Sequence, residues 1–297
     1  MKYLISHKTT YTYYEPVSLC HNIARLVPRN TERQFCRNVT VKIEPEPDTI
    51  NEYKDFFGNK IIYFSIEQEH AQLTVHVRSE IESIEPVAVG VAGGAQGGMA
   101  GGAQGRVANG AHEGTEDPAE IRQFIFATPM TGVSEEVLNY ARVSFPPGRP
   151  VLEAATDLMH RIYRDFEFKS GYTTISTPLS VVLKERKGVC QDFAHLAIAC
   201  VRSVGLPARY VSGYIETVSP AGVERLIGVD ASHAWFSVYI PLLGWVDFDP
   251  TNNVLPSIQH ITIGWGRDYA DIAPLNGIIL SSGSHGLGVS VVVKREV

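Results

Sequence analysis

The sequence predicts an α+β protein with an all-β N-terminal domain, a flexible linker and a second domain in which helices pack on an antiparallel sheet. Three observations lead to this fold class. Apolar residues alternate with period two up to residue 86, glycine and alanine dominate residues 87–116, and a helical period followed by further strands fills residues 117–297. A length of 297 residues also fits two domains at roughly 150 residues each.

Residues 1–86 are expected to form strands separated by turns. In NVTVKIEP, the apolar Val39, Val41 and Ile43 alternate with polar residues, and KIIYFSI and LTVHVRS repeat this period. Such alternation is typical of strands with one buried face. The segment FFGNK between strands has the composition of a turn. We therefore expect a small β-sandwich here.

Residues 87–116 differ abruptly in composition. The sequence GGAQG occurs twice, and glycine is concentrated throughout the segment. The high backbone entropy of glycine makes such a segment hard to order. Because no strand leads directly into it and no GxxxxGK[ST] pattern follows, it does not resemble a phosphate-binding loop. A linker is the expected structure.

Helical patterns begin after this linker. A first helix is expected from Pro150, with one apolar face that consists of Val151, Ala155, Leu158, Met159, Ile162 and Phe166. A shorter helix is expected in TPLSVVLKERKG, with Thr177 as its N-cap, Pro178 in its first position and Gly188 at its end.

A third helix is expected in KGVCQDFAHLAIACVRSVGLP, ending at Gly205 and Pro207. Strand patterns then return in ARYVSGYIE, HAWFSVYIP and GWVDFDP, and the tail VSVVVKRE is expected to be one more strand. Helices followed by a run of strands favour helices packed on an antiparallel sheet.

Composition narrows the class of function. The chain is 44% hydrophobic and 20% charged, which is typical of a globular protein. A net charge of −6 lacks the basic footprint of a protein that binds nucleic acid or an anionic membrane. The N-terminal MKYLISHKTTYTYYEP has no uninterrupted apolar core, and no apolar run of 18 residues occurs elsewhere. We therefore expect a soluble cytoplasmic protein that binds neither nucleic acid nor membranes.

Four cysteines are present without CxxC spacing, and we expect them to be reduced thiols: Cys20, Cys36, Cys190 and Cys200. Cys190 lies where the third helix begins, and a helix N-terminus favours the thiolate anion. Cys200 lies on the apolar stripe of the same helix and is expected to pack in the core. From the helix alone, Cys190 is as consistent with packing as with a nucleophile.

A nucleophilic cysteine needs a base, and that base needs an orienting acceptor. Among ten histidines, His195 is five residues past Cys190, so it points about 140° away around the helix. His233 opens the strand HAWFSVYI, where a side chain can project from a sheet toward a helix end. His233 is therefore the better candidate partner.

Carboxylates follow in WVDFDP. A five-residue loop from Ile240 to Gly244 would place Asp249 opposite Trp235 and diagonal to His233 on one face. A four-residue loop would instead place the two side chains on opposite faces. Asp247 would oppose Ser237, further from His233, so Asp249 is the better orienting residue.

Other catalytic patterns are missing from the sequence. It contains no HExxH, GxSxG or P-loop pattern. Asp247 and Asp249 could form a metal site or a glycosidase pair, but two acids this close on one short strand are more typical of a strand end. We therefore expect no metal and no cofactor.

The stretches GVCQDFAHLAIACVRSVGLPARYVSGY and ASHAWFSVYIPLLGWVDFDPTNN resemble the transglutaminase-like superfamily of papain-type cysteine enzymes, in which Cys, His and Asp occur in this chain order. The N-terminal YLISHKTTYTYYEPVSLCHNIARLVPR and the later IGWGRDYADIAPLNGII resemble segments of its bacterial members. The resemblance implies a papain/transglutaminase-like core. It also implies Cys190 as the nucleophile, His233 as general base and acid, and Asp249 as the residue that orients the imidazole.

The resemblance further implies acyl chemistry on amide bonds of a peptide or protein substrate, through a thioester at Cys190. Hydrolysis by a peptidase or amidase is slightly favoured, protein-glutamine amine transfer is one alternative, and a non-catalytic protein-binding module is another. The backbone N–H of Cys190 is the expected oxyanion donor, with Tyr172 or Gln191 as candidate second donors. Three tryptophans could line a groove or fill the core: Trp235, Trp245 and Trp265. The oligomeric state is not indicated.

Overall fold

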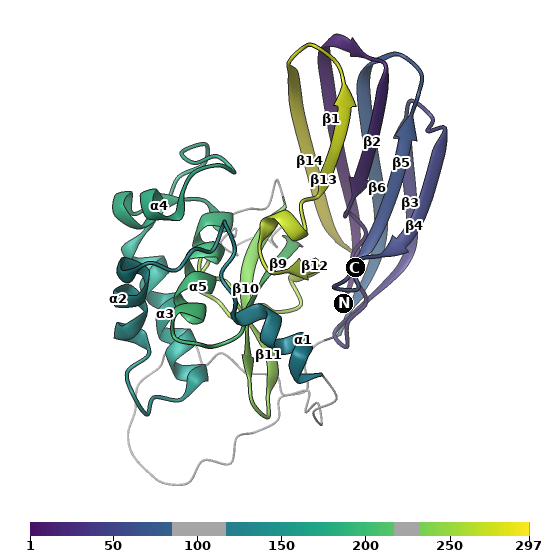
Figure 1. The fold of residues 1–297 in the computed structure, drawn as a ribbon. Helices are drawn as coiled ribbons and strands as arrows, with labels where there is room; N and C mark the ends of the chain where they lie inside the picture. The colour runs from purple at the N-terminus through teal and green to yellow at the C-terminus, as the bar shows by residue number, and fades with distance from the viewer. Residues whose placement is uncertain (85–116, 217–231, 297) are drawn as a thin grey trace.

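A computed structural model of the protein describes residues 1–84, 117–216 and 232–296 (Figure 1). A β-sandwich lies beside a second unit of helices and a four-stranded sheet. This is the α+β architecture expected from the sequence. The predicted linker, residues 87–116, lies outside the described residues.

The β-sandwich consists of two antiparallel four-stranded sheets, in the orders β14-β1-β6-β3 and β13-β2-β5-β4. Its strands are β1 (Lys2–Val17), β2 (Leu19–Ala24), β3 (Gln34–Glu44), β4 (Thr49–Lys54), β5 (Lys60–Ile66), β6 (His70–Ser83), β13 (Leu275–Leu280) and β14 (His285–Glu296). Apolar side chains such as Phe64 and Leu73 are fully buried between the sheets. The predicted turn in FFGNK is confirmed, with Gly58 at a φ of 73° that favours glycine.

The predicted C-terminal domain boundary is wrong. Residues 117–297 were expected to form one domain, yet β13 pairs with β2, and β14 pairs with β1 along its length, from Lys2 opposite Glu296 to Tyr13 opposite His285. The C-terminal strands therefore complete the sandwich. Alternation of apolar residues predicted the strand VSVVVKRE correctly, but this pattern carries no information on which strand is the partner.

The second unit contains the antiparallel sheet β11-β10-β9-β12. Its strands are β9 (Ala208–Ile215), β10 (His233–Ile240), β11 (Gly244–Phe248) and β12 (His260–Gly266). Its helices are α1 (Pro118–Arg122), α2 (Glu135–Ser144), α3 (Val151–Asp165), α4 (Leu179–Glu185) and α5 (Cys190–Ser203), with 3₁₀ turns η1 (Gln123–Ile125) and η2 (Tyr269–Asp271). A short parallel pair joins β7 (Glu167–Phe168) to β8 (Lys187–Gly188).

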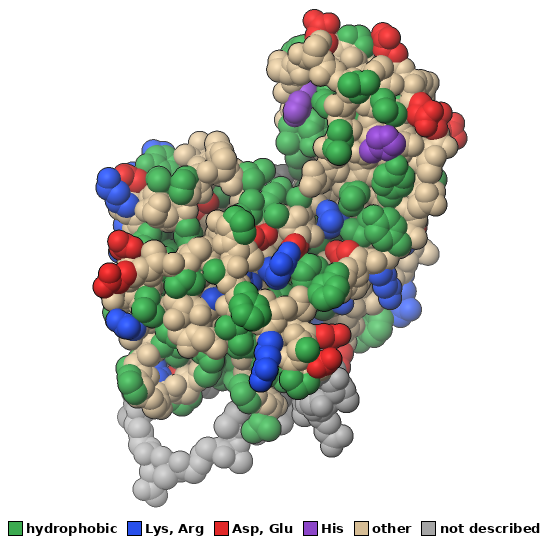
Figure 2. All heavy atoms as spheres, in the orientation of Figure 1, with side chains coloured by type: hydrophobic (Ala, Val, Ile, Leu, Met, Phe, Trp, Pro, Cys, Tyr) green, Lys and Arg blue, Asp and Glu red, His purple; other side chains and the backbone are tan. Residues whose placement is uncertain are grey.

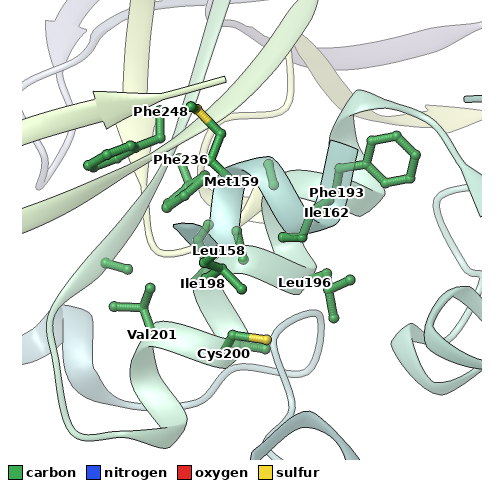
Figure 3. Packing of buried hydrophobic residues seen from close by; sticks show 14 of the residues in the cluster. Leu158, Met159, Ile162, Phe193, Leu196, Ile198, Cys200, Val201, Phe236 and Phe248 are labelled. Carbon is green, nitrogen blue, oxygen red and sulfur yellow. The ribbon is translucent and has the colours of Figure 1, made fainter. Parts of the chain in front are cut away.

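Helix α5 is the central element of the second core (Figure 3). One side packs on β10 and β9, and α2, α3 and α4 surround the other. Cys200 is fully buried among apolar side chains, which confirms its expected packing role. Helix α3 buries the predicted face, including Leu158 and Ile162.

The short helix α4 differs slightly from its prediction. Pro178 rather than Thr177 precedes its first residue. The helix ends at Glu185, and the next residue, Arg186, has a left-handed φ of 55°. Gly188 does not end the helix because Lys187 and Gly188 pair with β7. This pairing brings the segment before α4 beside the start of α5.

The sandwich is joined to the core sheet along β12. Tyr3, Ile81 and Val293 of the sandwich pack with Tyr214 and Ile261 of the core sheet in one buried cluster. Polar contacts reinforce this junction. The Gln34 side chain donates to the Thr262 carbonyl at 2.8 Å and accepts from the Thr262 N–H at 2.8 Å.

The molecular face in Figure 2 carries acidic and basic side chains interspersed with apolar ones. No helix within the described ranges is both long enough and apolar enough to span a bilayer.

Candidate active site

Cys190 is the first residue of α5, as the sequence predicted. Val189 precedes it in an extended conformation, and its N–H donates to Asp192 Oδ2 at 2.8 Å. The Thr173 hydroxyl donates to the same oxygen at 2.6 Å. A side chain at Gly188 would place its Cβ 2.8 Å from Asp192 Oδ2, so glycine allows this close approach. These contacts hold the cysteine at the helix end, where unpaired N–H groups favour an anion.

The β10–β11 hairpin positions the other two candidate residues. Ile240 pairs with Gly244 and Phe236 pairs with Phe248, which is the register of the five-residue loop. Asp247 is opposite Ser237, as this register requires. His233 and Asp249 therefore lie on the same face, and His233 Nε2 donates to Asp249 Oδ2 at 2.9 Å.

Asp249 is fully buried, and hydrogen bonds from residues that the structure describes hold both oxygens of its carboxylate. Oδ1 accepts from the backbone N–H groups of Thr251 at 3.0 Å and Asn252 at 3.2 Å. Oδ2 accepts from His233, from the Asn252 side chain at 2.8 Å and from His260 Nε2 at 3.1 Å. Burial raises the pKa of this carboxyl, but the charge and hydrogen bond of His233, together with the hydrogen bond of His260, lower it by more. Its pKa is consequently far below the usual range, and the carboxylate is the stable form.

His233 is buried, and its environment favours the imidazolium form. Burial lowers its pKa, whereas the charge and hydrogen bond of Asp249, together with Cys190, raise it to about 10. Its Nδ1 is buried without a well-formed hydrogen bond, while Cys190 lies near enough to contribute to this rise. Since Asp249 occupies Nε2, Nδ1 is the nitrogen left for the thiol. A loose contact is usual for a nucleophile and base before substrate binds.

The structure thus brings Cys190, His233 and Asp249 together at the end of α5. His233 and Asp249 are buried, whereas Cys190 is partly exposed. A partly exposed thiol beside a buried imidazole can transfer its proton to the ring and form a thiolate–imidazolium pair. The thiolate can then attack a carbonyl, and the imidazolium can give the proton to a leaving group.

His260 and Asn252 were not found from the sequence. Asn252 belongs to the DPTN run, and its backbone N–H bonds to an aspartate three residues earlier, a common turn pattern that could have been recognised. His260 lies at the start of β12, eleven residues after Asp249, and reaches the carboxylate because β12 pairs with β9 and β9 pairs with β10. The sequence carries no signal for that strand order.

His195 is buried outside the triad, where it accepts a hydrogen bond from the Tyr269 N–H at 3.2 Å. Trp235 is fully buried beside His233. Trp245 and Trp265 both stack with Arg209. Trp245 and Trp265 are partly buried, so none of the three tryptophans is fully exposed to solvent.

The two candidate oxyanion donors differ in position. Tyr172 is 40% exposed on the loop between β7 and α4, near Lys169 and Lys187. Gln191 is the second residue of α5 and is partly buried. Either side chain belongs to a segment that borders Cys190, so both stay candidates.

The donor atoms of His233, Asp249 and His260 lie within 4.8 Å of one another, close enough to raise the question of a metal ion. Both imidazoles point a nitrogen at the same oxygen, and an ionised carboxylate only accepts hydrogen bonds. These nitrogens therefore carry protons rather than free lone pairs. The arrangement fits a hydrogen-bonded cluster better than a ligand set.

The fold and this site define an α+β protein in which a cysteine at a helix N-terminus faces a histidine and an aspartate of an antiparallel sheet. Comparison with protein families agrees. The model of the bacterial transglutaminase-like N-terminal region matches residues 3–82, and that of the transglutaminase-like superfamily matches residues 142–250. The chain belongs to the transglutaminase-like superfamily and carries the N-terminal region of its bacterial members.

Individual relatives agree with this membership. An uncharacterized protein of Mycobacterium tuberculosis is 41% identical over 297 residues, covering 98% of this chain and 92% of that protein. A crystal structure described as a candidate cysteine protease from Cytophaga hutchinsonii superposes with a TM-score of 0.73 and 23% sequence identity. The superposition covers 100% of this chain and 91% of that chain, and it shows that the two share a fold. A protein-glutamine gamma-glutamyltransferase of Pseudomonas aeruginosa is 38% identical over 72 residues, 24% of this chain and 11% of that protein.

Proposed function

We propose that this protein is a cysteine-dependent acyl hydrolase or transferase that acts on amide bonds of peptides or proteins. Cys190 is the nucleophile, His233 the general base and acid, and Asp249 the residue that orients the imidazole. The observation that carries the proposal is the 2.9 Å hydrogen bond from His233 Nε2 to Asp249, which leaves Nδ1 for Cys190.

The first half of the reaction forms a thioester. The thiolate of Cys190 attacks the amide carbonyl carbon, and the electron pair of the C=O bond moves to oxygen. The backbone N–H of Cys190 at the start of α5 stabilises this oxyanion. When the tetrahedral intermediate collapses, the C–N bond breaks and His233 Nδ1 gives its proton to the leaving amine. The acyl group stays on Sγ.

The second half releases the acyl group. His233 Nδ1 accepts a proton from the incoming nucleophile, which adds to the thioester carbonyl. The C–S bond then breaks, and the thiolate and imidazolium are restored. With water the product is a carboxylic acid, and with a primary amine it is a new amide. Hydrolysis is the favoured outcome, since water needs no acceptor subsite.

The decisive experiment uses a mixed peptide pool, incubated with and without a primary amine and read by mass spectrometry. Cleaved peptides without amine adducts support a peptidase or amidase, and amine adducts at glutamine support the transferase. The Cys190→Ala variant should lose either activity. Cys200→Ala removes a buried thiol of the same helix and is the matched control.

A second measurement tests the site without a known substrate. Cys190 should react with iodoacetamide near pH 6 much faster than Cys36, whose pKa is raised to about 11 by burial despite the nearby Lys60. If Cys190 reacts no faster than Cys36 and Cys190→Ala keeps every measurable activity, the enzymatic proposal is wrong, and the non-catalytic protein-binding module becomes the alternative to test.

A further inference from the structure

His260 contacts the same carboxylate oxygen as His233, from strand β12, which lies two strands away from β10 in the core sheet. Its Nε2 lies 3.1 Å from Asp249 Oδ2, while His233 Nε2 lies 2.9 Å from that atom. Both side chains are almost completely buried, at 2% and 0% exposure. His260 is therefore a buried imidazole of the catalytic cluster that takes no part in the reaction described above.

The hydrogen bonds of His260 define its protonation. The Ser257 N–H points toward Nδ1 at 3.4 Å, which makes Nδ1 an acceptor. The carboxylate at the opposite nitrogen can only accept, so Nε2 carries the proton. One neutral tautomer satisfies both contacts. His260 therefore serves as a fixed N–H donor to Asp249 and needs no change of charge.

The position of His260 is strongly determined by packing. Strand β12 pairs with β9 through His260 opposite Ile215, and the sandwich holds β12 from outside through Gln34. The centroid of the Trp235 ring lies 5.4 Å from that of the His260 ring, in an edge-on arrangement, and 6.1 Å from that of the His233 ring. One fully buried tryptophan thus packs against both imidazoles and limits the rotation of each ring.

We propose that His260 is a positioning residue of the active site. Its Nε2–H holds Oδ2 of Asp249 in the orientation that aligns His233 with Cys190. This inference rests on the proposed function, because orientation matters only if His233 and Cys190 react. Among the residues that the structure describes, it faces the charged Asp249 on the hairpin and the titratable His233, whose ring centroid lies 6.3 Å away.

The test compares His260→Leu, which removes the donor, with His260→Gln, whose side-chain amide keeps an N–H. The readout is the rate of Cys190 alkylation by iodoacetamide across pH, which requires no substrate. His260→Leu should lower the rate near pH 6 about tenfold, the size typical of a lost orienting partner, and His260→Gln should stay within about threefold of the parent protein.

His7→Leu is the matched control. His7 is equally buried and makes two hydrogen bonds, to Tyr214 and Thr9, at the junction with the sandwich. This variant should lose stability without changing the alkylation profile. In an Asp249→Ala background the effect of His260→Leu should disappear, because the two residues act as one unit.

The outcomes separate the two proposals. If Cys190 of the parent protein is unreactive, the proposed function fails. If Cys190 is reactive and depends on His233, but His260→Leu reacts like the parent, the role of His260 is wrong. Equal losses in the leucine and glutamine variants, accompanied by equal losses of stability, would also overturn it. Should the leucine variant not fold, ¹⁵N NMR of the parent protein decides, because finding the proton of His260 on Nδ1 contradicts the proposal.

Discussion

His233 and Asp249 lie diagonally across the β10–β11 hairpin and meet through a 2.9 Å hydrogen bond in a fully buried site. Their contact depends on the register of the hairpin, since a shift by one residue moves every side chain to the opposite face. The loop that sets this register is consequently as important to the site as the two residues themselves.

The turn at the hairpin tip offers the first prediction. The Leu243 N–H donates to the Ile240 carbonyl at 3.0 Å, with Pro241 and Leu242 between them, and Leu242 has a φ of 69° and is 91% exposed. This is a type II turn, whose third position favours glycine. Leu242→Gly should stabilise the protein by about 1 kcal/mol in urea unfolding, with unchanged Cys190 alkylation.

Deletion of Leu242 is the complementary change. It should move Asp249 away from His233 and abolish fast alkylation of Cys190, even if the protein folds. A deletion variant with the reactivity of the parent protein would show that the hairpin register does not position the site.

Gly213 gives a second prediction. It pairs with His233, and an added Cβ would lie 2.2 Å from the Trp235 ring and 2.4 Å from the Ile261 carbonyl oxygen. Gly213→Ala should therefore destabilise the protein by about 1–3 kcal/mol or more and reduce Cys190 alkylation. Gly132→Ala is the control, because no atom lies within 4 Å of its Cβ and its φ is not positive. Similar thermal unfolding of both variants would contradict this account.

Asp249 itself gives a third prediction. Asp249→Asn removes the carboxylate that holds His233 and stabilises its positive charge. The amide that replaces it would also turn an N–H group toward groups that are themselves donors. The rate constant kcat should fall by about 10²–10⁴, the range seen when an orienting acid is replaced by its amide. KM should change little, because Asp249 is buried and does not reach substrate. A purely raised KM would be inconsistent with an orienting role.

The pH dependence of stability gives a fourth prediction. Burial lowers the pKa of His7, with help from His76, and lowers that of His195, in each case from 6.5 to about 4. Between these values the unfolded chain binds protons that the native protein does not, so stability falls as pH drops from 6.5 toward 4. The pKa of His233 is about 10 in the native protein and 6.5 in the unfolded chain. Its contribution to the free energy of unfolding is therefore complete below pH 6.5 and is lost as pH rises toward 10.

Urea unfolding across pH should therefore give a stability maximum near pH 6.5 from these three histidines. His7→Gln should flatten the acidic side of the curve and leave the alkaline side unchanged. His233→Gln should do the reverse. A flat curve between pH 6.5 and 9.5 in the parent protein would contradict the raised pKa of His233.

Local pattern was sufficient for much of the fold. The spacing of apolar residues predicted the helices around Leu158 and Cys190, several strands of residues 1–86, and strands β10 and β11, which position His233 and Asp249. The helix start at Cys190 also followed from local pattern, because the apolar stripe begins there. The assignment of the C-terminal strands to the second domain failed because strand pairing is non-local.

By itself, the sequence determined the α+β class, the position of Cys190 at a helix N-terminus and the candidate set of Cys190, His233 and Asp249. It left the hairpin open between two registers, and it did not reveal His260. Tertiary structure decided both. The turn at Leu242 selects the register that joins His233 to Asp249, and the strand order β10-β9-β12 brings His260 to the same carboxylate. Spacing along a chain encodes which face a side chain occupies, whereas the neighbours on that face depend on strands that pair across distant segments.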